Sequence, residues 1–151
     1  MRLLVVTLLL TACSASVSVH VGQNADQYNA AWRNGMTAVA RSSEAFKSGV
    51  CNVGGDQNGC HAASVAAIDA IDTFLKDLSQ AKVPSDFAGA DAAVRKALQD
   101  WRAGLVRRNR GFELQSDEDF GAGNDEIKAA TQAFVVAYQR FPTVTRPQPA
   151  P

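Results

Sequence analysis

Four stretches of the chain repeat apolar residues at intervals of three, four and seven, which places their side chains on one face of an α-helix. None of these four stretches alternates apolar and polar residues as a half-buried strand does. A helix with one apolar face is stable only when that face packs against other helices, so the pattern predicts an all-α fold. The apolar stripes run over Tyr28–Phe46, Ala63–Leu78, Phe87–Phe112 and Phe120–Phe141.

The connections between these stretches are short, which favours an up-down-up-down four-helix bundle over residues 24–141. Asn24 or Asp26 is a suitable N-cap for the first helix, and Ser48-Gly49 is a suitable end. The segment Asp56-Gln57-Asn58-Gly59 is rich in turn-forming residues and predicts a turn before the second helix.

Proline and glycine set the other expected boundaries. Pro84 should end the second helix, because proline disfavours helical backbone at the residue before it. Ser85-Asp86 then provides a cap for the third helix. Gly121 and Gly123 lower helix propensity, so a firm fourth helix is expected only from about Asn124. Residues 142–151 are proline-rich and read as a disordered tail.

The first twelve residues have the layout of a secretory signal: Arg2, then the apolar run Leu3–Leu10, then small residues. Eight apolar residues make about 12 Å of helix, whereas the hydrocarbon core of a bilayer is roughly 30 Å thick. The run is therefore too short to be a membrane span. A buried strand remains an alternative, since a short apolar run has no diagnostic period.

The tetrapeptide Leu10-Thr11-Ala12-Cys13 resembles the lipobox that ends the signal peptide of bacterial lipoproteins. The resemblance implies that the Cys13 sulfur carries a diacylglyceryl group and that cleavage before it removes residues 1–12. It also implies a protein of the bacterial cell envelope, held by its lipid on the extracytoplasmic side of a membrane. Residues 13–23 would then be the lipidated cysteine and a flexible tether.

The other two cysteines, Cys51 and Cys60, are separated by the flexible sequence NVGGDQNG. On the oxidising side of a membrane a disulfide is expected between them, stapling the first inter-helix loop to the second helix. Closing a loop of this size contributes about 2–3 kcal/mol in the chain-entropy model. A zinc site that adds His61 and Asp56 to this pair is the less favoured alternative.

Composition excludes some classes of partner. The chain has 15 basic and 15 acidic residues, so no basic excess points to nucleic acid or to anionic lipid headgroups. Four arginines form the one notable charge cluster and could clamp a phosphate or carboxylate. In the alternative interpretation, these arginines are neutralised by three acidic residues that follow across a turn, Asp117, Glu118 and Asp119. The arginines are Arg102, Arg107, Arg108 and Arg110.

The sequence contains no complete motif for cofactor binding, metal binding or catalysis. Cys60-His61 lacks the C-x-x-C-H spacing of haem attachment, and the Asp56–Gly59 segment lacks two main ligands of a calcium-binding EF-hand loop. No nucleophile elbow or phosphate-binding glycine loop occurs. We therefore expect no cofactor and no enzyme activity.

Three functional hypotheses follow. The first is a lipid-anchored helical module that binds a protein or envelope component. The second is a carrier of a small apolar ligand in a cavity lined by Trp32, Phe74 and Trp101, which Ala97→Leu would block. The third, the least favoured, is a metal-binding protein that uses Asp69, Asp72 and His61.

Overall fold

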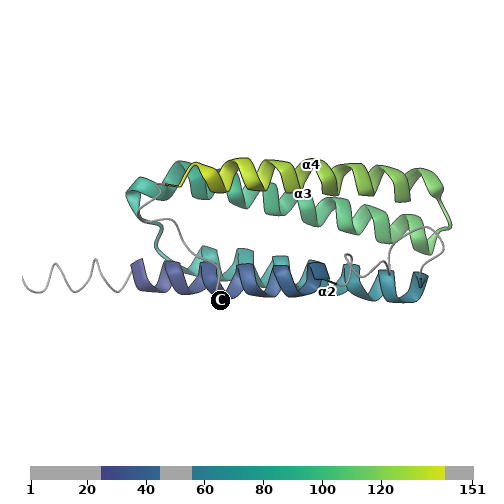
Figure 1. Ribbon diagram of the computed structural model, residues 1–151, viewed down its shortest axis with the longest axis horizontal. Coiled ribbons are helices and arrows are strands. Elements are labelled where there is room, and N and C mark those ends of the chain that lie inside the picture. Colours follow the sequence, from purple (N-terminus) through teal and green to yellow (C-terminus); the bar gives the residue numbers. More distant parts are fainter. Residues whose placement is uncertain (1–24, 45–55, 142–151) are drawn as a thin grey trace, which may run out of the picture.

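The computed structural model describes residues 25–44 and 56–141, and all of its regular secondary structure there is helical. Successive helices run in opposite directions, so the all-α four-helix prediction is confirmed (Figure 1). The first helix and α2 form one layer, and α3 and α4 form the other. The elements are the first helix (residues 25–44), α2 (Gln57–Gln80), the 3₁₀ helix η1 (Ser85–Phe87), α3 (Ala88–Glu113) and α4 (Asp117–Gln139).

Several predicted features fall outside the described residues. These are the signal segment, the tether, the loop with Cys51, the Ser48-Gly49 end of the first helix and the tail. Asp26 lies inside the first helix, so the prediction that it caps this helix is wrong, and Asn24 is not described.

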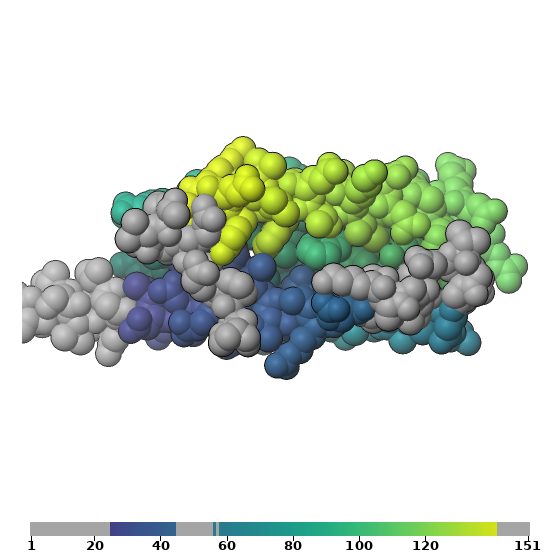
Figure 2. All heavy atoms as spheres, viewed as in Figure 1, coloured from purple at the N-terminus to yellow at the C-terminus, as the bar shows by residue number. Residues whose placement is uncertain are grey.

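The space-filling view shows the first helix and α4 along opposite edges of one face (Figure 2).

The second helix begins earlier than predicted. Asp56 is its N-cap, because its carboxylate accepts a hydrogen bond from the backbone N–H of Asn58 at 3.1 Å. The backbone N–H of Cys60 donates to the Asp56 carbonyl at 2.9 Å. The residues predicted to form a turn are thus a cap and the first helical turn, since an aspartate satisfies the free N–H groups of a helix start.

The start of the third helix also differs from the prediction. Ser85 and Asp86 lie in η1, and α3 begins at Ala88 without a side-chain cap. The predicted break at Pro84 is confirmed, because α2 ends at Gln80. The 3₁₀ turn brings Phe87 into the core, where its side chain is buried.

The α3–α4 connection is a tight turn in which Gln115 takes the left-handed conformation, with φ of 53°. The backbone N–H of Gln115 donates to the carbonyl of Phe112, and that of Ser116 donates to Gly111 at 2.7 Å. This is the Schellman pattern that ends many helices. The Ser116 hydroxyl then accepts from the backbone N–H of Asp119 at 3.2 Å and caps α4.

Close packing against α3 explains why α4 starts at Asp117 and not near Asn124. A Cβ on Gly111 would collide with the backbone nitrogen of Phe120, and one on Gly123 would collide with that of Arg108. Glycine is therefore required for the backbones of α3 and α4 to approach this closely. The tertiary contact outweighs the low helix propensity of glycine, so the prediction of a late start is wrong.

The apolar stripes meet in one core, as predicted. Its aromatic centre is Trp32, which is fully buried and packs edge-on against Phe74 and Phe141, with ring centroids 5.4 and 5.0 Å away. Gly35 allows the Phe74 ring to lie directly on the first helix, because any Cβ there would overlap it. Other core side chains are Tyr28, Ile71, Leu78, Phe87, Val94, Leu98, Leu105 and Phe134.

Candidate functional site

The predicted arginine cluster is dispersed in the structure, because the four residues point in different directions around α3. At 100° per residue, positions 102, 107, 108 and 110 are spread around most of the helix. Arg102 reaches α2, where its guanidinium donates to both carboxylate oxygens of Asp72 at 2.6 and 3.0 Å. These hydrogen bonds raise the pKa of Arg102.

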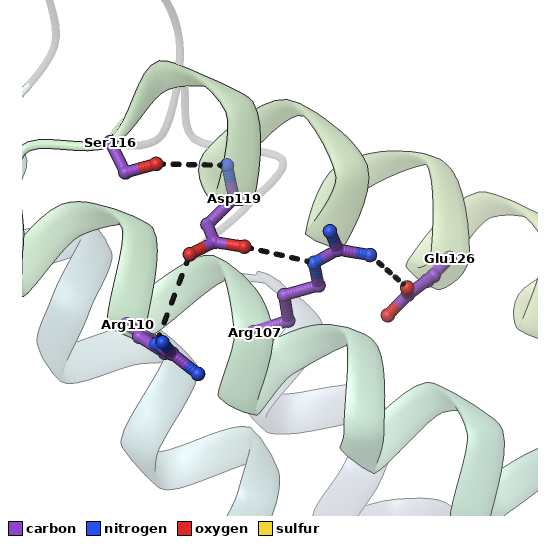
Figure 3. Close-up of polar contacts among 5 residues, drawn as sticks. All are labelled: Arg107, Arg110, Ser116, Asp119 and Glu126. Carbon is purple, nitrogen blue, oxygen red and sulfur yellow. Dashed lines mark hydrogen bonds and ion pairs between the residues drawn. The ribbon is translucent and has the colours of Figure 1, made fainter.

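Arg107 lies between two carboxylates of α4 (Figure 3). Its guanidinium donates to Glu126 at 2.8 Å and to Asp119 at 3.2 Å, and both bonds raise its pKa. Arg110 is 3.8 Å from the other oxygen of Asp119. Asp119 is one of the three acidic residues expected to neutralise the cluster, whereas Glu126 comes from two turns further along α4.

Arg108 points into the bundle and is 6 % exposed. It donates to the hydroxyl of Ser64 on α2, which is fully buried, and lies 3.5 Å from the side-chain oxygen of Asn124 on α4. Burial lowers its pKa, because desolvation disfavours the charged form. Arg108 therefore links three helices in the interior.

The side chains of the metal hypothesis do not come together. Asp72 is paired with Arg102, and Asp69 faces outward on α2. His61 stacks on Phe112 of α3, with ring centroids 5.4 Å apart and planes inclined by 24°. Among residues 25–44 and 56–141, no three His, Cys, Asp or Glu side chains are grouped so that they could hold a metal ion.

Of the predicted covalent sites, only Cys60 lies in the described part of the chain. It is buried in the first turn of α2. Cys13 and Cys51 are not described, so the lipid and the disulfide stay predictions. None of the described helices has the length and apolar character needed to cross a membrane.

The aromatic side chains of the carrier hypothesis pack against other rings. Trp32 and Phe74 contact each other, and Trp101 is half-buried with its ring 6.5 Å from that of Phe134. Ala97 is buried in the core. None of these four residues lines the open hollow between α3 and α4 or the one between the first helix and the end of α2.

A buried polar network joins the first helix to α2 and α3. The Tyr28 hydroxyl donates to Asp91 at 2.8 Å, and Asp91 also accepts from Arg95, whose guanidinium donates to the Leu78 carbonyl at 2.7 Å. Burial raises the pKa of the Tyr28 phenol above its ordinary value, and the Asp91 contact acts in the same direction. Sequence reasoning missed this network, although Asp91 falls on the apolar stripe between Ala90 and Val94.

An open groove of about 480 Å³ lies between α3 and α4. Alanines form much of its lining, and a carboxylate from each helix completes it. Val106 and Val136 lie one turn from groove alanines and are 43 % and 52 % exposed. The groove is lined by Asp100, Ala103, Glu126, Ala129, Ala130 and Ala133.

Each groove carboxylate has an ion-pair partner on α3. Lys96 contacts Asp100 at 2.8 Å, and Arg107 contacts Glu126 at 2.8 Å. The four side chains are 39–74 % exposed, so these pairs are accessible to a partner. Sequence reasoning missed the groove because the residues of its two walls are 23 to 33 positions apart in the chain.

Comparison with known proteins gives no further guide to function. The chain matches no protein-family model, and neither the curated proteins nor the solved structures contain a significant match. Functional proposals therefore depend on the sequence motifs and on the geometry above.

Proposed function

We propose that this chain is a lipid-anchored module of the bacterial envelope that binds a protein partner through the α3–α4 groove. Cys13 would carry the lipid, and residues 14–23 would tether the bundle to the membrane. A Cys51–Cys60 disulfide would fix the loop before α2. The bundle itself would present the groove on the extracytoplasmic side.

The groove is the observation that carries this proposal. It combines a lining of alanines with two accessible carboxylates, and two exposed valines lie one turn along the same helices from these alanines. Small side chains allow the backbone of a partner helix to approach closely, because the distance between packed helices depends on the side chains at the contact. The dispersed arginines support the same interpretation, since their contacts are made within the bundle.

In-cell photocrosslinking tests the proposal. The crosslinking amino acid p-benzoylphenylalanine replaces Ala103 in the groove or Ala66, which is exposed on α2, in the cells that make the protein. We expect one discrete crosslinked protein from position 103 and none from position 66. Crosslinks from position 66 with none from position 103 would contradict the groove as the binding face.

A further inference from the structure

We infer that Asn58 is a site of spontaneous deamidation, whereas the fold protects Asn34, the other asparagine that precedes a glycine. The sequence contains these two Asn-Gly pairs, Asn58-Gly59 and Asn34-Gly35. A following glycine favours the reaction, because it has no Cβ to hinder attack by its own backbone nitrogen. The inference concerns the start of α2 and does not depend on the proposed partner.

The reaction requires water but no enzyme and no cofactor. The backbone nitrogen of Gly59 loses its proton to solvent and attacks the side-chain carbonyl carbon, Cγ, of Asn58, so that a new C–N bond forms. The bond from Cγ to the side-chain nitrogen then breaks, and this nitrogen takes up a proton and leaves as ammonia. A cyclic succinimide remains, and one water molecule opens it to an aspartate or an isoaspartate.

The start of α2 gives Asn58 the freedom that this reaction needs. Asn58 is exposed, and Figure 1 shows α2 beginning at the end of the bundle that holds the α3–α4 turn. The first hydrogen bond of the helical ladder runs from the N–H of Cys60 to the carbonyl of Asp56, so the Gly59 nitrogen lies just before the ladder. The Asn58 N–H donates to the Asp56 carboxylate in an exposed bond of 3.1 Å. Helix ends open at little cost in free energy, and opening of this turn brings the Gly59 nitrogen within reach of Cγ.

The pair Asn34-Gly35 has the same reacting atoms, but the fold holds them apart. Both residues lie in the middle of the first helix, where the N–H of Gly35 belongs to the helical ladder. Gly35 is buried, and the Phe74 ring lies directly on it. Turning the backbone toward the cyclic form would break the ladder and displace Phe74 from its contact with Trp32. Asn34 is itself exposed, so its protection comes from the fixed backbone and not from burial of the side chain.

Deamidation would change the first turn of α2 in one of two ways. This turn has no acidic residue, and a carboxylate at position 58 would interact favourably with the helix dipole. Isoaspartate instead inserts a methylene group into the backbone, which interrupts the regular geometry of a helical turn. The two products therefore have opposite effects on the turn that contains Cys60.

Peptide mapping by mass spectrometry tests the inference on the purified full chain after storage in mildly alkaline buffer. Conversion at position 58 should be at least about tenfold faster than at position 34, because terminal turns open more readily than helices packed in a core. In concentrated urea, where the fold is lost, the two rates should become similar. A methyltransferase that recognises isoaspartate should label the stored protein at position 58.

Two glycine variants separate the chemistry from general effects of substitution. Gly59→Ala should slow conversion at position 58, because a Cβ hinders the attacking nitrogen. The matched control Gly121→Ala, at a position where a Cβ meets no other atom, should leave the rate unchanged. Equal rates at positions 58 and 34 in the folded chain, or no conversion at position 58, would overturn the inference. So would a rate that Gly59→Ala does not lower.

Discussion

Gln115 shows how one residue can store strain in an otherwise regular bundle. Its φ of 53° is the conformation that ends the α3 helix in the Schellman pattern. Glycine takes this conformation without the steric clash that a Cβ introduces. The turn is retained because Ser116 both completes the end of α3 and caps α4.

Replacing Gln115 with glycine should therefore stabilise the protein by about 0.5–1 kcal/mol, measured by urea unfolding. Gln99→Gly is the matched control, because Gln99 is exposed in the middle of α3. The free energy of unfolding of that variant should be lower by about 1 kcal/mol, the usual effect of glycine inside a helix. Destabilisation by Gln115→Gly would mean that the turn does not adopt this conformation in solution.

Tyr28 is predicted to make the stability of the folded protein decrease at alkaline pH. Because burial raises the pKa of its phenol, the folded state binds this proton more tightly than the unfolded state does. The resulting stabilisation is complete below the unfolded pKa of about 10 and is lost as pH rises above it.

The variant Tyr28→Phe isolates this effect. At pH 8 it should be less stable by about 1–3 kcal/mol, since Asp91 loses a buried hydrogen-bond donor. Above about pH 10 the difference from wild type should shrink, because only wild type has this group to ionise. Urea unfolding at pH 8 to 11 measures both. A difference that stays constant would show that Tyr28 ionises normally in the folded protein.

At the scale of the helices, glycine has opposite effects at neighbouring positions of α4. A Cβ on Gly123 would collide with the backbone of α3, whereas a Cβ on Gly121 would have no atom within 4 Å. We expect Gly123→Ala to destabilise the bundle by about 1–3 kcal/mol, the usual range for overpacking.

Gly121→Ala is the control in the same turn and should stabilise the protein by about 0.4–1 kcal/mol, because alanine restricts the unfolded chain and favours helix. Thermal or urea unfolding of the two variants tests the packing directly. Similar effects of the two substitutions would contradict the close contact between α3 and α4.

Comparison of these elements shows what the sequence could predict. The apolar stripes predicted four helices and most core side chains, because helical period is a local property. The predicted start of α4 was wrong because Gly123 is needed for close packing against α3. That helix is distant in sequence, so the local pattern around Gly123 does not reveal this role. The start of α2 was predicted to be a turn because Asp56 and Gly59 are common in turns as well as at helix starts.

The functional surface was harder to predict for the same reason. Four arginines that are close in sequence point in different directions once α3 forms, and their partners come from α2 and α4. The groove needs two helices to be paired in register before Asp100 and Glu126 can flank one hollow. Periodicity within one helix contains no information on that register.

At the scale of the whole molecule, attachment to the membrane is predicted to depend on one side chain. A diacylated cysteine holds a protein stably at a membrane, because two acyl chains bind far more strongly than one. Cys13→Ser should therefore move the protein from the membrane fraction to the soluble fraction after cell lysis. Retention of this variant in membranes would show that another feature anchors the chain.

The most direct test of the central claim is native mass spectrometry of the protein purified gently from the membranes of its own cells. We predict a lipidated chain with one protein partner bound non-covalently. Ala103→Arg should lose this partner, and Ala66→Arg, at an exposed position of α2, should keep it. A stoichiometric small molecule in place of a protein, or a partner that Ala103→Arg retains, would contradict the assignment of the groove.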